Sequence, residues 1–257
     1  MRVYAVSDIH VDYPENMQWV EALDVDEYQN DILILAGDVS DDLARLGAAF
    51  ELLAAKFSAV LFVPGNHELW VDGEQYDCSL EKLEAINALC DSAGIVRSRT
   101  TINGINFVPL MSWYDFSFGE PSRRIRRAWR DFKSCSWPAR LSSEYEITSH
   151  FLAMNTPHLK AVDNFTISYS HFLPRIDVMP SRIPEERRNV YPVLGSDRLG
   201  QQLQQLKPDI HVYGHSHVNQ AIELDDVMYV NNAFAYPGEG RISRKQLYCV
   251  FELDAQL

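Results

Sequence analysis

The 257-residue chain alternates short apolar runs with longer stretches in which apolar positions recur every three or four residues. Short β-branched runs bounded by polar residues are typical of buried strands, and the longer periodic stretches are typical of amphipathic helices. The short runs predict strands over residues 2–6, 31–36, 59–63, 105–110, 165–169 and 210–213. The periodic stretches predict helices over residues 42–56, 80–92, 144–162 and 197–206.

Beyond residue 220 the pattern changes, because short apolar runs follow one another without a helical stretch between them. Residues 221–224, 228–230 and 247–253 therefore read as antiparallel strands. The whole pattern predicts an α/β fold with a largely parallel early half and a more antiparallel end. We find no internal repeat, low-complexity tract or Gly/Ser linker, so we expect residues 1–257 to form a single domain.

Composition and charge narrow the class of protein. The chain is 46% hydrophobic and 23% charged, which is typical of a soluble globular protein. Its formal net charge of −13 argues against a partner with an extended anionic surface, so we expect neither a membrane nor a nucleic acid as partner. The N-terminal MRVYAVSDIHVD lacks the apolar core of a signal peptide, and no later run reaches membrane-spanning length. A cytoplasmic location is the expectation.

The four cysteines, Cys78, Cys90, Cys135 and Cys249, are widely spaced and form no CxxC pair. We expect them to be buried small hydrophobic residues in a reducing compartment and not a disulfide framework.

Candidate chemistry lies directly after five of the predicted strands. The polar blocks are SDIH (Asp8, His10), GDVSD (Asp38, Asp41), GNHE (Asn66, His67), a lone His171, and GHSH (His215, His217). Open α/β sheets build ligand sites at the carboxyl ends of their strands, so five such blocks indicate one assembled site. Carboxylate, amide and imidazole donors without a thiolate suit Mn, Fe, Zn or Co better than a Ca or Mg cage.

The GHSH block raises a question of geometry. On extended chain, His215 and His217 would point to the same face but stay several ångströms apart along the strand. A single ion could bind both only if the backbone bends. Two neighbouring ions, or a sharp turn after Gly214, would suit the spacing better.

In this order, the blocks D-x-H, G-D-x-x-D, G-N-H-[DE], H and G-H-x-H resemble the calcineurin-like metallophosphoesterase family. The resemblance runs from Asp8 to His217, roughly four fifths of the chain, with every block intact. It implies a four-layer αββα sandwich with mixed sheets and a dinuclear metal centre at the carboxyl ends of the strands. It also implies a hydrolase that acts on phosphate esters.

The resemblance further implies a role for each block residue. It distributes seven ligands over two ions: Asp8, His10 and His217 on one ion, Asn66, His171 and His215 on the other, and Asp38 bridging both. His67 would be the catalytic acid that protonates the leaving group, and Asp41 would orient it. Gly214 would let the backbone turn close to the centre. The cofactors would be two divalent transition-metal ions, with Mn the first choice and Fe, Zn or Co the alternatives. A hydroxide shared by the two ions would attack the phosphorus.

One departure from the family pattern narrows the substrate. In serine/threonine protein phosphatases the second block continues with an Arg that grips phosphate, and here that position is Asp42. We therefore expect a small or medium phosphorylated molecule as substrate. The alternatives are a phosphodiesterase or nuclease acting on nucleotides or single-stranded nucleic acid, and a non-catalytic scaffold on the same fold. An intact block set that includes His67 argues against the scaffold.

Residues 121–140 are basic although the chain as a whole is acidic. Arg123 to Arg140 include seven Lys or Arg residues and one Asp. One interpretation is an amphipathic helix with Ile125, Trp129 and Phe132 inward and its charges solvated or paired with acidic neighbours. The other is a basic flap that contacts the phosphorylated substrate through Arg123, Arg124, Arg126 and Arg127. In that case later arginines could join it and replace the missing motif Arg: Arg175, Arg182, Arg187 and Arg188.

The remaining polar residues near the blocks receive structural interpretations. We expect His150, His158 and His211, which lie outside the blocks, to have ordinary structural roles. Asp42 is expected to begin a helix, and Asp12 to be solvated.

Overall fold

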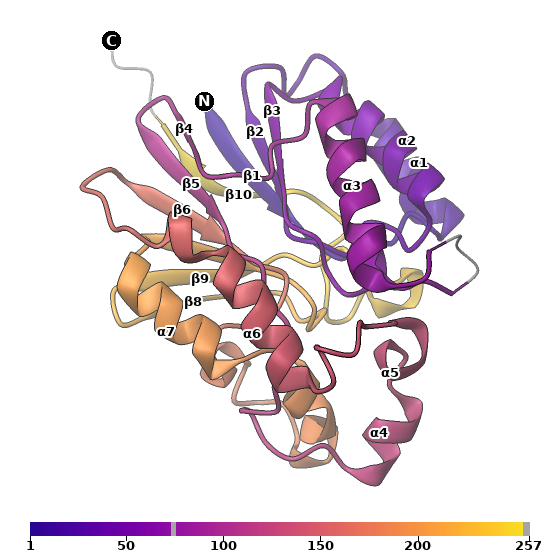
Figure 1. The fold of residues 1–257 in the computed structure, drawn as a ribbon. Helices are drawn as coiled ribbons and strands as arrows, with labels where there is room; N and C mark the ends of the chain where they lie inside the picture. The colour runs from indigo at the N-terminus through magenta and orange to yellow at the C-terminus, as the bar shows by residue number, and fades with distance from the viewer. Residues whose placement is uncertain (73–75, 254–257) are drawn as a thin grey trace.

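The protein, described here by a computed structural model that covers residues 1–72 and 76–253, contains two β-sheets packed face to face (Figure 1). The first sheet has the strand order β10-β1-β2-β3, and the second has the order β4-β5-β6-β7-β9-β8. The strands are β1 Arg2–Val6, β2 Ile32–Leu35, β3 Ala59–Phe62, β4 Thr100–Ile102, β5 Ile105–Pro109, β6 Thr166–Tyr169, β7 Ile210–Tyr213, β8 Gln220–Leu224, β9 Val227–Asn231 and β10 Tyr248–Glu252.

Helices cover the outer face of each sheet (Figure 1). The α-helices are α1 Pro14–Ala22, α2 Leu43–Ala54, α3 Ser79–Ala93, α4 Arg123–Ala128, α5 Asp131–Ser134, α6 Glu144–Met154 and α7 Asp197–Leu206. Short 3-10 helices join them: η1 His67–Leu69, η2 Thr156–His158, η3 Ile176–Val178, η4 Glu185–Val193 and η5 Pro237–Glu239. In Figure 1 helices α1 to α3 lie on one side of the sandwich, and α6 and α7 lie over the second sheet.

Separate hydrophobic cores hold these four layers together. Residues such as Ile34 from β2 and Ile167 from β6 fill the space between the two sheets. The other faces of the sheets pack on helices, with Phe50 of α2 in the core of the first sheet and Leu203 of α7 in the core of the second. The predicted four-layer αββα sandwich with mixed sheets is confirmed.

Strand direction places the predicted block residues at one edge of the sandwich. Strands β1, β2 and β3 are parallel to one another, as are β5, β6, β7 and β9. Among the described strands, the antiparallel pairs are β4 with β5, β8 with β9 and β10 with β1. The expected more antiparallel end is confirmed, since β8, β9 and β10 each pair antiparallel with one neighbour. On its other side β9 pairs parallel with β7, because β8 takes the edge of the sheet and β9 lies between β8 and β7.

Two predicted boundaries were wrong. The helix expected over residues 144–162 ends at Met154, because Pro157 opens the short η2 and cannot continue the α-helical hydrogen bonds. Asn155 fixes this end, since its side chain both accepts from and donates to the backbone of Met111 at 2.8 Å. The basic segment forms α4 and α5 with a break at Trp129, instead of one amphipathic helix.

The cysteines are free, as expected, but only Cys90 is buried, and Cys249 is exposed on the edge strand β10. Among the described residues no helix is both long and apolar enough to cross a membrane.

Candidate metal centre

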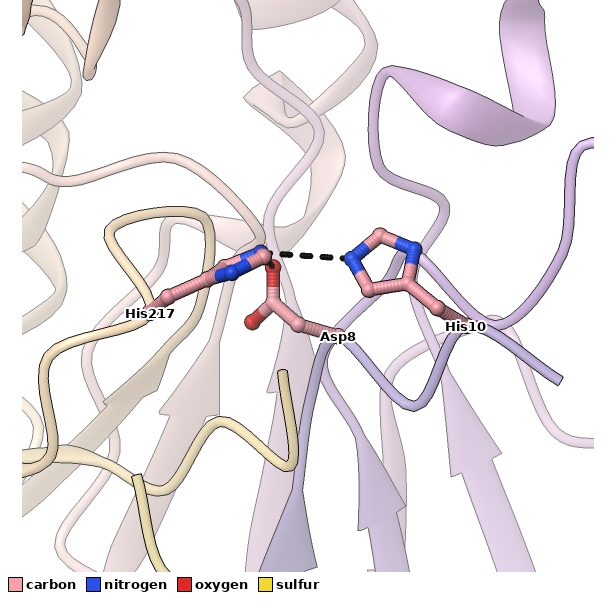
Figure 2. A group of neighbouring side chains, drawn as sticks. All are labelled: Asp8, His10 and His217. Atoms are coloured by element: carbon pink, nitrogen blue, oxygen red, sulfur yellow. Dashed lines mark hydrogen bonds and ion pairs between the residues drawn. The ribbon is translucent and has the colours of Figure 1, made fainter. Parts of the chain in front are cut away.

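The loops that follow β1, β2, β3, β6 and β7 bring the block residues together at one edge of the sandwich. One group consists of Asp8, His10 and His217, whose potential ligand atoms lie within 4.8 Å of one another (Figure 2). Nε2 of His10 is 3.2 Å from Nε2 of His217, which in turn is 3.3 Å from Oδ1 of Asp8. Asp8 and His10 are buried, and His217 is partly buried.

A second group lies beside the first and contains Asp38, His171 and His215. Nε2 of His171 is 3.3 Å from Oδ2 of Asp38, 3.1 Å from Nδ1 of His215 and 3.1 Å from Oδ1 of Asn66. Asp38 also belongs to a third group, with His10 and His67. The Asp38 carboxylate therefore stands between the two halves of the cluster.

The chemistry of these donors fits metal ions. Pairs of imidazole nitrogens face one another at hydrogen-bond distance, an arrangement that a shared cation satisfies better than protons do. The cluster also attracts positive charge. Burial lowers the pKa values of His171 and His217, but the adjacent Asp38 and Asp8 carboxylates outweigh it and raise them to about 9 and about 10. For Asp8, the facing His217 outweighs the opposite effect of burial and lowers the pKa to about 2.

Five of the seven predicted ligands have left-handed backbone conformations. The φ angles are 52° for Asp8, 47° for His10, 55° for Asp38, 65° for His215 and 55° for His217. A non-glycine residue in this region costs about 1–3 kcal/mol, and such residues gather at functional sites where the surrounding fold enforces them. This strain answers the spacing question, because His215 and His217 lie in a turn beyond β7 and not on extended chain.

Gly214 matters through close approach and not through its φ angle. A Cβ atom at this position would lie 2.8 Å from Oδ2 of Asp8 and 2.9 Å from the carbonyl oxygen of Ala36. Only glycine lets the loop after β7 pass so near the end of β1. The backbone N–H of His215 then donates to both oxygens of Asp8 at 3.1 Å.

Glu68 holds two of the block loops together. Its fully buried carboxylate accepts from the backbone N–H groups of Gly65, Asp38, Val39 and Ser40, at 2.6 to 3.2 Å. Burial, followed by the charge of Asp38, raises the pKa of Glu68 to about 7. This residue is the last of the GNHE block, so the block pattern contained it, but its structural role was not predicted.

Asp131 is a second contributor to the site that lies outside the sequence blocks. Its buried carboxylate accepts from Nδ2 of Asn66 at 2.8 Å and from the indole N–H groups of Trp70 and Trp129 at 2.7 Å each. The bond to Nδ2 turns the Oδ1 atom of Asn66 towards His171. The available signal was that Asp131 is the only acidic residue within the basic segment.

Glu239 and Tyr236 complete the wall beside His217. Oε2 of Glu239 lies 2.6 Å from Nδ1 of His217, a contact that fixes the imidazole ring. The Tyr236 ring stacks on His10 with the ring centroids 4.5 Å apart. Both residues follow β9, and no motif in the sequence marked them.

His67 lies at the rim of the cluster. Its ring packs on Trp70 with the centroids 3.6 Å apart, and its Nε2 is 3.7 Å from Oδ2 of Asp38. Burial lowers the pKa of His67, and the Asp38 charge opposes that shift. Asp41, the expected orienting partner, lies 3.5 Å from the Arg130 guanidinium, and no hydrogen bond joins it to His67 within the described part of the chain.

The cluster opens into a cavity of about 570 Å³. Its wall includes Trp129, Arg130 and Asp131 from the basic segment. The arginines expected to contact substrate, namely Arg123, Arg124, Arg126 and Arg127, are exposed on α4 and are not part of this wall. Arg130 is part of the wall, and its guanidinium lies 4.1 Å from the centre of the Trp70 ring.

The structural interpretations outside the blocks agree with the structure except for Asp12. His211 is buried between Oγ of Ser168 and Oγ of Ser170, at 2.8 and 3.1 Å, as a structural residue. Asp42 caps α2 by accepting from the N–H of Arg45 at 2.8 Å. Asp12 was expected to be solvated but lines the cavity and accepts from Ser40 at 2.6 Å.

Comparison with known families defines the class. The sequence model of the calcineurin-like phosphoesterases matches residues 1–219. The chain therefore belongs to the calcineurin-like phosphoesterase family and is a hydrolase that acts on phosphoric ester bonds. The family uses divalent metal ions, and the clustered donors above are the candidates to hold them.

Two comparisons with a single mycobacterial protein are more specific. The chain is 30% identical over 125 residues to the acyl-carrier-protein phosphodiesterase PptH of Mycobacterium tuberculosis, a match that covers 45% of this chain and only 38% of that relative. The crystal structure of phosphopantetheinyl hydrolase (PptH) from Mycobacterium tuberculosis superposes with a TM-score of 0.79 and 24% identity, over 97% of this chain and 95% of that one. The structural likeness supports the fold.

Proposed function

We propose that this protein is a two-metal phosphodiesterase. The observation that carries the proposal is the sharing of Asp38 between neighbouring groups of potential ligands, because a carboxylate in that position can bridge two ions. Asp8, His10 and His217 would hold one ion, and Asn66, His171 and His215 would hold the other. When bound, the ions supply Lewis-acid activation of water and neutralise charge on the phosphoryl oxygens.

The protein groups then have distinct tasks. Asp131 orients the Asn66 amide, and Glu239 orients the His217 ring. His67, at the rim of the cluster, donates a proton to the departing alkoxide. Arg130 faces the cavity and contacts the phosphate, in place of the Arg that the second block lacks.

A diester is the preferred substrate class over a monoester. The partial match to a protein named as a phosphodiesterase supports this choice. The wall of the cavity supports it too, since Arg130 is its only arginine among the described lining residues, and a diester carries less charge to neutralise than a monoester dianion does. The net charge of −13 disfavours the alternative of a nuclease on long nucleic acids.

The test is turnover on a panel of esters after metal-stripped protein has received Mn, Fe, Zn, Co or Mg. The panel contains alkyl and aryl monoesters, matching diesters, and a phosphopantetheinyl carrier protein, the type of substrate for which the relative is named. We expect diesters to be hydrolysed with higher kcat/KM than the matching monoesters. A preference for monoesters would show a monoesterase, and no turnover with any metal would favour the non-catalytic scaffold.

A further inference from the structure

A second cavity lies beside the metal centre. It has a volume of about 580 Å³, close to that of the first cavity. The two share four wall residues: Val190, Leu194, Ser216 and Ile242. Ser216 stands between His215 and His217 in the chain, so the shared wall touches the loop that carries two of the candidate ligands. The two cavities therefore adjoin, and a substrate bound at the metal centre has the second cavity next to it.

Four arginines line this cavity, and we call it the arginine cavity. They are Arg182, Arg187, Arg241 and Arg244, brought together from the chain around η4 and from the chain after η5. None of the described residues that line the cavity is acidic. The nearby Glu185 and Glu186 lie on η4 but are not part of its lining.

These four guanidinium groups lack partners among the described residues, a property that they share with exposed arginines such as Arg124 but combine with a place around one hollow. Within the described residues, none of them takes part in an ion pair or a side-chain hydrogen bond, and all four residues are exposed. By contrast, Arg175 pairs with Asp177 and Asp225, each at 2.6 Å, and Arg188 donates to backbone carbonyl oxygens. In a chain with a net charge of −13, four unpaired cations around one hollow form a local positive field that favours an anion.

The shape of the cavity indicates a compact anion. It is a hollow with apolar wall residues such as Ile183, Pro184 and Tyr191 between the arginines, and not a flat charged face. A hollow of about 580 Å³ has the volume of a pocket that holds a small molecule or part of one. Guanidinium groups bind phosphate oxygens in paired, charge-assisted hydrogen bonds.

We propose that the arginine cavity binds a second phosphate group of the substrate, one that is not hydrolysed. This inference rests on the proposed function, because it places the scissile diester at the metal centre and the second phosphate beyond the shared wall. It narrows the substrate class to phosphodiesters that carry a further phosphate on one of their organic arms.

A matched pair of probes tests the inference. Thymidine 3′-phosphate 5′-(p-nitrophenyl phosphate) carries the second phosphate, and thymidine 5′-(p-nitrophenyl phosphate) presents the same scissile diester without it. We expect kcat/KM to be at least about tenfold higher for the first probe. In an Arg187→Gln/Arg241→Gln variant this ratio should fall towards one. An Arg97→Gln/Lys160→Gln variant loses the same charge away from both cavities and should keep the ratio of the parent.

A binding measurement separates failure of this inference from failure of the proposed function. Calorimetry on Asp38→Asn protein compares thymidine 3′,5′-bisphosphate with thymidine 5′-monophosphate, and it needs no turnover. We expect the bisphosphate to bind at least about tenfold more tightly, and the Arg187→Gln/Arg241→Gln changes to remove that advantage. Equal affinities and a probe ratio near one would overturn the arginine cavity as a phosphate site, even if the arginine changes slowed turnover of a carrier protein.

Discussion

The two walls of the metal-centre cavity are built in different ways. The wall made by the strand-end loops carries the candidate ligands, and five of those residues hold strained left-handed backbone conformations. The opposite wall comes from the segment around α4 and α5, and of Trp129, Arg130 and Asp131 none has a positive φ. This second wall acts through side-chain contacts: Asp131 orients Asn66, and Arg130 packs on Trp70 and pairs with Asp41.

The difference shows how the site divides its tasks. Strained backbone persists only where the fold enforces it, and here Glu68 ties the loops after β2 and β3 together through four backbone hydrogen bonds. The strand-end wall can therefore fix donor atoms within narrow limits, as a metal centre requires. The wall formed by the segment around α4 and α5, here called the segment wall, orients one candidate ligand and shapes the substrate space. Substitutions in the segment wall should therefore reduce metal affinity and activity less.

The largest effect on metal affinity is expected from Asp38→Asn, in the strand-end wall formed by the loops after the strands. The substitution keeps the shape of the side chain but removes the charge that faces both halves of the cluster. Metal affinity should fall by more than about 100-fold, beyond the loss that is typical for a residue that only supports a ligand. Elemental analysis should show reduced occupancy of both sites. If occupancy of one site stayed at the parent level, Asp38 would not be the bridge.

His67→Gln should slow hydrolysis of alkyl esters by about 10²–10⁴-fold and of nitrophenyl esters much less. An alkoxide gains greatly from protonation as it leaves, whereas a nitrophenolate is stable as an anion. Metal content should stay at the parent level, as measured by elemental analysis. Loss of metal would make His67 a ligand, in keeping with its place beside His10 and Asp38. An equal loss on both ester types would assign it to positioning.

Asp131→Asn tests the segment wall. The substitution weakens the acceptor that holds the Asn66 amide and two indole N–H groups, so the affinity of one metal site should fall by about 10–100-fold. Competitive chelator titration measures this loss. The matched control is Asp115→Asn, since Asp115 is also nearly buried in the same part of the chain but lies outside the cavity wall. If both variants lost affinity equally, the effect would come from general destabilisation.

The smallest effect is expected from single arginines of the basic segment. Arg130→Ala should raise KM for a diester by about five- to tenfold with less effect on kcat, because a cavity-wall cation binds the anion before the chemical step. Arg124→Ala, on the exposed face of α4, should leave KM unchanged. A KM increase for Arg124→Ala at low salt would restore the hypothesis that α4 itself recruits the substrate.

The two walls were also unequally predictable from the sequence. The strand-end wall could be predicted because each block directly follows a buried apolar run, and parallel strands bring their ends to one edge. The role of Asp131 could not be predicted, because it depends on two indole groups and an amide that only the folded chain brings to its carboxylate. Glu239 lacked any motif at all. Two helix boundaries were wrong for local reasons: Pro157 ends α6 early, and a break at Trp129 divides the basic segment into α4 and α5.

We propose that the strand-end loops hold two metal ions bridged by Asp38. The most direct test is to titrate metal-free protein with Mn²⁺ and to record stoichiometry by calorimetry and spin coupling by electron paramagnetic resonance. We expect saturation at two ions per chain with an exchange-coupled signal, and loss of that signal in Asp38→Asn protein. Saturation at a single ion, or two ions without coupling, would contradict it.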